Sequence, residues 1–199
     1  WIGELTPTHT AKQRAERLGV RGASEKRIAI AFALAGEQKH SRSAYTNALA
    51  AYEDAQRAEP LNHWVLTQLL AMAGLPQLDP DGTAAATKYS AWWVTARQLA
   101  RWQLQYAQGT DRIWAQGTLA VLELLGAVYQ GTKFDADAAR ETIVELCQDI
   151  CAATPADGFP RMSTLRQFRR YARYWQRKGW DTVVAKAIAA LEDETGRSA

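Results

Sequence analysis

The histidines and cysteines are the side chains of this sequence best suited to bind metal ions, so their spacing is informative. The three histidines, His9, His40 and His63, fall in or near three different predicted turns, and none has the His-x-x-x-His spacing of a zinc site. Cys147 and Cys151 lie four residues apart on a predicted helix. They could form a redox or metal-binding pair, or they could pack in the core as small apolar side chains. No cationic residue adjoins them to lower a thiol pKa, so we favour core packing.

Other catalytic and ligand-binding patterns fail on inspection. The run from Asp79 to Thr83, Asp-Pro-Asp-Gly-Thr, looks superficially like a calcium loop, but Ser90 stands where the twelfth position requires a bidentate glutamate. A turn followed by a helix cap explains this run better. The sequence contains no glycine-rich phosphate loop, no Gly-x-Ser-x-Gly elbow and no dinucleotide fingerprint. We therefore predict no catalytic residue, no metal site and no cofactor, and a protein that is not an enzyme.

The strongest electrostatic feature is the segment 161–178, which carries seven positive charges and no acidic residue. Because the whole chain has a net charge of +3, the rest carries −4. Its apolar residues recur at helical spacing, and five arginines share the opposite flank: Arg166, Arg169, Arg170, Arg173 and Arg177. These charges repel one another, which predicts an acidic partner. The partner could be Glu192, Asp193 and Glu194 of the last helix, an acidic protein surface, or a nucleic-acid backbone, with Tyr171 and Tyr174 interleaved for stacking.

Eight tryptophans are an unusual number for 199 residues. Trp92, Trp93, Trp102 and Trp114 fall on the long central helices, where large rings can fill the space between helix pairs. Adjacent helical residues point about 100° apart, so Trp92 and Trp93 cannot both face one core. We expect most of the eight in the core and one or two on a binding surface, where tryptophan dominates binding energy.

The composition and the positions of helix-breaking residues predict an almost wholly helical chain. Alanine, leucine, glutamine, glutamate and arginine are frequent, and alternation typical of strands is hard to find. Glycine, proline and capping residues divide the sequence into nine expected helices: 8–18, 24–35, 41–58, 62–74, 83–108, 110–130, 135–153, 163–178 and 181–194. No stretch has the roughly 18 apolar residues of a membrane span. Two cysteines predict a reducing cytoplasm, and a first residue Trp1 predicts a piece of a larger protein, with possible fusion to other domains.

One helix pair has the spacing of a known repeat. Small, aromatic and proline residues follow one another at fixed intervals, and a large aromatic precedes them on the first helix: Phe32, Gly36, Ala48, Tyr52, Ala55 and Pro60. This unit resembles the tetratricopeptide repeat, a helix–turn–helix unit of 34 residues. We expect Gly36 and Ala48 where the two helices cross, and Ala51 on the outer face. A second, weaker match comprises Leu125, Gly126, Tyr129 and Ala138, but Thr142 stands where the repeat has an aromatic.

The resemblance implies an all-α, right-handed α-α superhelix of about four helix pairs, in which each pair packs only on its neighbours. The expected division is an N-terminal cap helix over 1–22, repeats over 23–158, and a basic helix with a capping helix over 159–199. The runs 25–28 and 59–64 are also similar to divergent tetratricopeptide regions of bacterial multidomain proteins. Those regions often lie beside peptidases in presumed defence systems, which implies a sensor or adaptor role.

We therefore expect a non-catalytic protein–protein interaction or scaffold module that binds a peptide or partner domain on a concave surface. An acidic partner is one option. The expected contacts lie on the first helix of each pair, in the turns and on the basic helix: Lys39, His63, Trp64, Gln68, Arg112, Arg166, Arg169, Arg170, Arg173 and Arg177. The alternative is a nucleic-acid or anionic-ligand sensor that binds through the basic helix 161–178. No membrane partner is expected.

Overall fold

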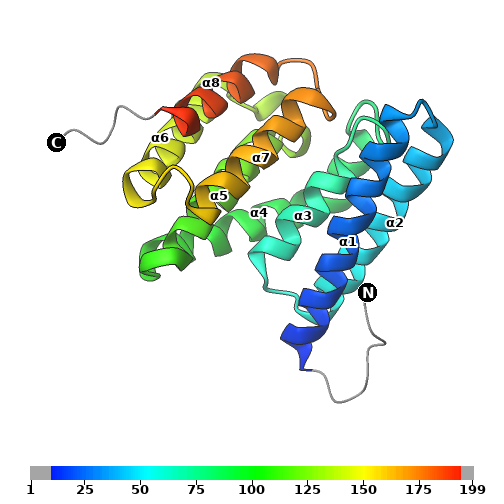
Figure 1. The fold of residues 1–199 in the computed structure, drawn as a ribbon, viewed down its shortest axis with the longest axis horizontal. Helices are drawn as coiled ribbons and strands as arrows, with labels where there is room; N and C mark the ends of the chain where they lie inside the picture. Colours follow the sequence, from blue (N-terminus) through cyan, green and yellow to red (C-terminus); the bar gives the residue numbers. More distant parts are fainter. Residues whose placement is uncertain (1–9, 194–199) are drawn as a thin grey trace.

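A computed structural model describes residues 10–193 of the protein. Over this range the chain forms α-helices and one short 3-10 turn and contains no strand, so the predicted all-α class is confirmed. No helix in the described range is both long and apolar enough to cross a membrane. The elements, shown in Figure 1, are α1 (Ala11–Leu34), α2 (Gln38–Ala58), α3 (His63–Ala73), α4 (Thr83–Tyr106), α5 (Gly109–Tyr129), η1 (Gly131–Lys133), α6 (Ala136–Ala153), α7 (Phe159–Arg173) and α8 (Asp181–Glu192).

Side-chain caps explain where several helices begin. Thr10 and Gln13 form a capping box at the start of α1. The side chain of Asn62 accepts from the Val65 amide at the start of α3, and Asp135 accepts from two amides of the first turn of α6. The predicted starts at 62 and 135 therefore agree with the structure.

The predicted break at Gly19 is wrong, because α1 continues through it to Leu34. A Cβ atom added at Gly19 would lie 2.8 Å from the ring of Trp64, and one at Gly22 would lie 2.8 Å from the ring of Tyr52. These glycines allow close packing of α1 and do not end a helix. The expected start at Ser24 is also wrong, since its hydroxyl donates to the Val20 carbonyl within the same helix. The expected boundary between 1–22 and 23–158 thus falls inside α1.

Two small residues of the repeat pattern do not have their predicted roles. Gly36 has a φ of +79° and no atom within 4 Å of an added Cβ, so it ends α1 in a left-handed turn and is not at a helix crossing. Ala138 is exposed, and the next residue, Ala139, is buried instead. Ala51, predicted on the outer face, is 2% exposed, so that prediction is also wrong.

The other positions of the pattern lie mostly in the core. Ala48, Tyr52 and Ala55 of α2 are each 0% exposed, as is Leu125 of α5. Gly126 allows close packing, because an added Cβ would lie 3.0 Å from the Phe134 ring. Tyr129 is buried and donates to the Leu70 carbonyl over 2.7 Å. Phe32 is half-buried and packs on the ring of His40, and Pro60 follows the end of α2 at Ala58.

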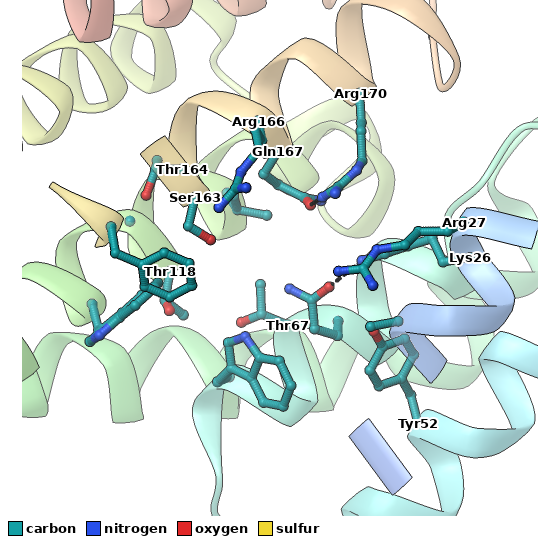
Figure 2. A pocket seen from close by; sticks show the side chains of 17 residues that line it. Lys26, Arg27, Tyr52, Thr67, Thr118, Ser163, Thr164, Arg166, Gln167 and Arg170 are labelled. Atoms are coloured by element: carbon teal, nitrogen blue, oxygen red, sulfur yellow. Dashed lines mark hydrogen bonds between the residues drawn. The ribbon is translucent and has the colours of Figure 1, made fainter. Parts of the chain in front are cut away.

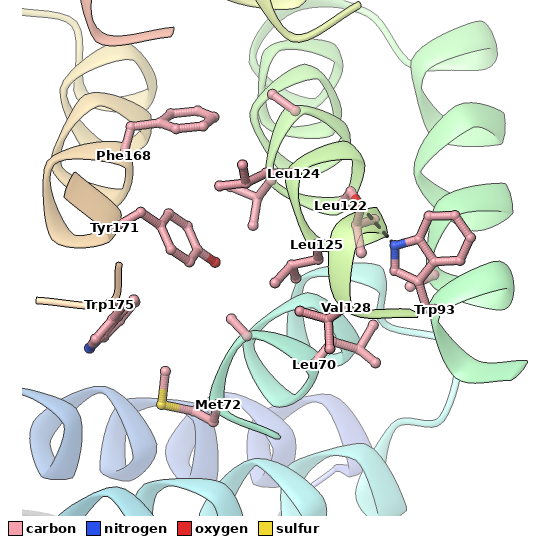
Figure 3. Packing of buried hydrophobic residues seen from close by; sticks show 14 of the residues in the cluster. Leu70, Met72, Trp93, Leu122, Leu124, Leu125, Val128, Phe168, Tyr171 and Trp175 are labelled. Carbon is pink, nitrogen blue, oxygen red and sulfur yellow. Dashed lines mark hydrogen bonds between the residues drawn. The ribbon is translucent and has the colours of Figure 1, made fainter. Parts of the chain in front are cut away.

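Successive helices pack on one another from the α1–α2 pair to α6 at the other side of the molecule, and α8 then packs on both α6 and α7 (Figure 1). The central element is α5, in which residues 115–126 are all buried. Figure 3 shows Leu124 and Leu125 of α5 facing Phe168 and Tyr171 of α7, while Trp93 of α4 packs on the other side. Trp93 is buried and donates to the Leu122 carbonyl, whereas Trp92 is half-buried.

The basic helix is shorter at its C-terminal end than predicted. It begins at Phe159, not at residue 163, and ends at Arg173, not at 178. The chain from 174 to 180 then turns back onto the N-terminal half of the molecule. There Trp175 donates from its indole nitrogen to the hydroxyl of Tyr45 over 2.9 Å, and Gln77 donates to the Tyr174 carbonyl over 2.7 Å. These contacts bring the last part of the chain against α2 and the connection between α3 and α4.

Candidate functional site

A pocket of about 290 Å³ opens between the N-terminal and C-terminal halves of the protein. Four of the five helices that line it are the first, third, fifth and seventh along the chain, and α2 adds one residue. This size lies near the lower end of the range for small-molecule clefts. The lining residues are Ala23, Lys26, Arg27, Tyr52, Trp64, Thr67, Gln68, Trp114, Gly117, Thr118, Val121, Phe159, Ser163, Thr164, Arg166, Gln167 and Arg170 (Figure 2).

One end of the pocket is strongly cationic. Lys26 and Arg27 of α1 approach it from one wall, and Arg166 and Arg170 of α7 approach it from the opposite wall (Figure 2). Of the residues that the structure describes, no aspartate or glutamate lines the pocket. The four groups are close enough to repel one another: burial, followed by the charges of Arg27 and Arg166, lowers the pKa of Arg170. We call these four residues the cationic cluster.

Lys26 is the most unusual member of the cationic cluster. It is 4% exposed, and its ammonium group donates to the side-chain oxygen of Gln68 over 2.7 Å. It also lies 5.8 Å and 5.6 Å from the ring centroids of Tyr52 and Trp175. Within residues 10–193 it forms no ion pair with a carboxylate. Burial, together with the charges of Arg170 and Arg27, lowers the pKa of Lys26 to about 7.

A buried hydroxyl beside the cluster lacks a hydrogen-bond partner. Tyr52 is 0% exposed, and its hydroxyl forms no hydrogen bond in the described part of the chain. Burial raises the pKa of this phenol, so the hydroxyl stays protonated and can donate. Leaving such a group unpaired costs about 1–3 kcal/mol. Gln167, by contrast, is partly engaged, since its side-chain oxygen accepts from Arg170 over 3.1 Å.

Aromatic rings form the other end of the pocket. The rings of Trp114 and Phe159 meet edge to face with centroids 5.7 Å apart, and the Arg166 guanidinium lies 5.7 Å from the Phe159 ring. Trp64 is 37% exposed. Helices α5 and α7 approach each other closely along this side of the pocket, since a Cβ added at Gly117 would lie 2.5 Å from the Thr164 hydroxyl. This end offers flat apolar surface beside the cationic cluster.

The structure places four of the predicted contact residues together and separates the others. Trp64, Gln68, Arg166 and Arg170 line the pocket. His63, half-buried in the first turn of α3, and exposed Lys39 do not line it. Burial lowers the pKa of His63. Arg112 donates to the Leu104 carbonyl at the α4–α5 connection over 2.6 Å.

The basic segment is divided among several structural roles. Arg161 is 3% exposed and donates to the Leu191 carbonyl at the end of α8. Arg169 pairs with Glu192 over 2.7 Å, which is one of the internal pairings considered from the sequence. Arg177 donates to the carbonyls of Gly74, Asp79 and Pro80, and Arg173 packs on the ring of Tyr174. Glu194 lies outside the described residues.

Sequence reasoning missed several residues of the pocket: Lys26, Arg27, Trp114 as a pocket residue, Phe159 and Gln167. A signal for Lys26 was present. On α1 the residues Ala15, Gly19, Gly22, Lys26 and Ala29 are buried and follow one another at intervals of three or four. A lysine inside a buried stripe of small residues is unusual, because lysine is almost never fully buried without a partner.

The other candidate chemistry lies apart from this pocket. Cys147 is 0% exposed, and burial raises the pKa of its thiol to about 12, which suits a core residue. The thiol of Cys151 lies 3.3 Å from the Ala190 carbonyl of α8. Across residues 10–193, no three histidine, cysteine, aspartate or glutamate side chains gather as a metal site would require. His9 lies outside the described residues.

Comparisons with known proteins find nothing similar. No family model matches the chain, and neither the curated proteins nor the solved structures contain a match. The tetratricopeptide resemblance therefore stays a prediction from the sequence.

Proposed function

We propose that this protein is a non-catalytic interaction module that binds an acidic peptide segment of a partner protein in the pocket between α1, α3, α5 and α7. In a right-handed superhelix of helix pairs, the first helix of each pair lines the concave face. The participation of these four helices in one pocket supports that arrangement. In a larger bacterial protein, such a module would suit a sensor or adaptor role in the cytoplasm.

The observation that carries the proposal is the charge of the pocket wall. In the described part of the chain, four cationic side chains and no carboxylate line the pocket. Charge complementarity steers association and selects the partner, so a ligand with clustered negative charge is favoured. The rings of Trp64, Trp114 and Phe159 would pack on the rest of the peptide, because tryptophan and arginine contribute strongly at binding sites.

The distribution of the arginines favours a compact anionic group over a nucleic-acid strand. A strand would need a groove of free cations along its backbone. On the segment 161–178, Arg161, Arg169 and Arg177 are engaged with other parts of the chain. Only Arg166 and Arg170 of this segment line the pocket. The basic helix thus supports recognition of a compact cluster of negative charge at one place.

Selection from a random peptide library tests this proposal. We expect the protein to enrich peptides with clustered aspartate and glutamate. A double variant, Arg166→Gln with Arg170→Gln, should bind them at least about 100-fold more weakly, because it removes the charge-assisted hydrogen bonds of two arginines, about 1.5–3 kcal/mol for each.

The matched control is Arg169→Gln with Arg173→Gln, which removes the same charge from the same helix outside the pocket. It should retain binding within about threefold, since neither Arg169 nor Arg173 lines the pocket. Equal losses in the two double variants, or enrichment of peptides without acidic residues, would contradict the proposal.

A further inference from the structure

We propose that the cationic cluster binds a phosphate monoester, carried on a phosphorylated side chain of the bound peptide. This inference rests on the proposed function and names the chemical group for which the pocket is built. The supporting observations are the number and type of the cations, the buried ammonium of Lys26 and the unpartnered hydroxyl of Tyr52.

The number of charges favours phosphate over carboxylate. A carboxylate brings one negative charge and two oxygens, whereas a phosphate monoester brings a charge of about −1.5 to −2 and three acceptor oxygens. Lys26, Arg27, Arg166 and Arg170 converge in the pocket, and none of its lining residues within 10–193 is acidic. Burial, followed by repulsion from Arg27 and Arg166, lowers the pKa of Arg170. A group with two charges relieves more of this repulsion than a group with one.

The residue types also favour phosphate. Three of the four cations are arginines, whose planar forks bind phosphate oxygens through paired hydrogen bonds. Arg170 donates from one terminal nitrogen to Gln167, and Arg166 donates from its Nε atom to the Met162 carbonyl. These bonds fix the direction of each guanidinium and use only part of its five donors.

Lys26 and Tyr52 independently indicate that this end of the pocket binds an anion. A lysine that is 4% exposed, with its ammonium bonded to a neutral amide oxygen, is costly unless an anion approaches it. The hydroxyl of Tyr52, on α2, is directed toward the cationic end of the pocket (Figure 2), and it has no hydrogen-bond partner within residues 10–193. An anion between α1 and α7 would compensate the charges of both walls.

The remainder of the pocket favours a peptide as the carrier of the phosphate. The volume of about 290 Å³ suits one side chain with its phosphate, and the rings of Trp64, Trp114 and Phe159 extend the surface beyond the cluster. Free phosphate or a small phosphorylated molecule shares the same chemistry but leaves this aromatic surface without a contact. We therefore assign the phosphate to a side chain of the bound peptide.

The test compares three acidic peptides that are identical except for a central phosphoserine, glutamate or serine, with inorganic phosphate as a competitor. Binding is measured by calorimetry and by the total tryptophan fluorescence, to which Trp64 and Trp114 of the pocket contribute. We expect the phosphoserine peptide to bind at least about tenfold more tightly than the glutamate peptide. Lys26→Met and Arg170→Gln should each remove this preference, whereas Arg169→Gln, outside the pocket, should leave it unchanged.

The outcomes separate this inference from the proposed function. Equal affinity for the glutamate and phosphoserine peptides would overturn the phosphate assignment and leave acidic-peptide recognition standing. Competition by inorganic phosphate without binding of any peptide would overturn the assignment of the phosphate to a peptide, and the proposed function with it. A phosphoserine preference that survives in Lys26→Met and in Arg170→Gln would place the phosphate outside the cationic cluster.

Discussion

Lys26 shows how a single residue connects stability with recognition. Its aliphatic part lies in the stripe along which α1 packs, and its ammonium group reaches the pocket beside Gln68. Burying a charge without an opposite charge destabilises a folded protein. Proteins keep such residues where function needs them, at a cost in stability. The same logic applies to the unpartnered hydroxyl of Tyr52.

The stability of the protein should depend on pH through Lys26. Its pKa is lowered to about 7 in the folded state, with Arg27, Arg170 and the Tyr52 phenol as its neighbours, and it is about 10.4 in an unfolded chain. Between these values the unfolded chain binds the proton and the folded protein does not, so stability rises with pH. Below pH 7, Lys26 is charged in both the folded and the unfolded state, and the whole free-energy cost of burying its charge is present.

Replacement of Lys26 by methionine removes this dependence. We expect Lys26→Met to be more stable than the wild type by at least about 1 kcal/mol at pH 6, since each unit of pKa shift corresponds to 1.36 kcal/mol. The difference should shrink toward pH 10. Urea denaturation of both proteins across this pH range measures it. A difference that is constant with pH, or a less stable variant at pH 6, would contradict the burial argument.

At the residue scale, the sequence predicts the part of the pocket that lies on a recognisable pattern. Arg166 and Arg170 were found because like charges repeat on one helix flank, and Trp64 and Gln68 because they lie on the first helix of a pair. The approach of α7 to α1 could not be predicted, because it depends on residues more than 100 positions apart. The cations of α1 and those of α7 form one cluster only because these two helices approach each other.

At the element scale, a glycine can either end a helix or allow close packing within it, and the sequence does not distinguish these two roles. Gly19 is a packing position inside α1, and Gly36 is the residue that ends it. The distinction depends on what faces each glycine: the Trp64 ring at Gly19, and open space at Gly36. Helical character is predictable from composition and caps, whereas helix ends depend on such tertiary contacts. The burial of Ala51 is predictable from the sequence, because Ala51 lies three residues after Ala48 and therefore on the same helix face.

The α1–α2 pair provides a test of this packing. Ala48 is 0% exposed, and leucine there should overpack the core and lower the free energy of unfolding by about 1–3 kcal/mol. The control is Ala50→Leu, because Ala50 is exposed on the same helix. It should change stability by less than about 0.5 kcal/mol. Thermal denaturation of the two variants measures the effect, and similar losses in both would show that the burial of α2 is misassigned.

At the scale of the whole molecule, the segment after α7 joins the two halves of the protein. Trp175 is 0% exposed and donates to Tyr45, which lies 130 residues earlier in the chain. Arg177 donates to three carbonyls in the connection between α3 and α4. Because Trp175 also packs on the ammonium of Lys26, this junction forms part of the structure behind the pocket.

Arg177 should therefore contribute to global stability despite its place in a basic segment. Arg177→Met leaves the carbonyls of Gly74, Asp79 and Pro80 without this donor and should cost about 1.5–3 kcal/mol. Lys178→Met is the adjacent control, since Lys178 is exposed, and it should be nearly neutral. Denaturation by urea compares them. Equal stability of the two variants would mean that the junction is not held by Arg177.

The central claim is that an anionic group of the ligand binds between α1 and α7. The most direct measurement is a titration of isotope-labelled protein with the phosphoserine peptide, followed through amide chemical shifts. We expect the largest changes at Lys26, Gln68, Arg166 and Arg170, and we expect them to disappear in the Arg166→Gln, Arg170→Gln double variant. Changes confined to α4, α6 or α8, which do not line the pocket, would contradict it.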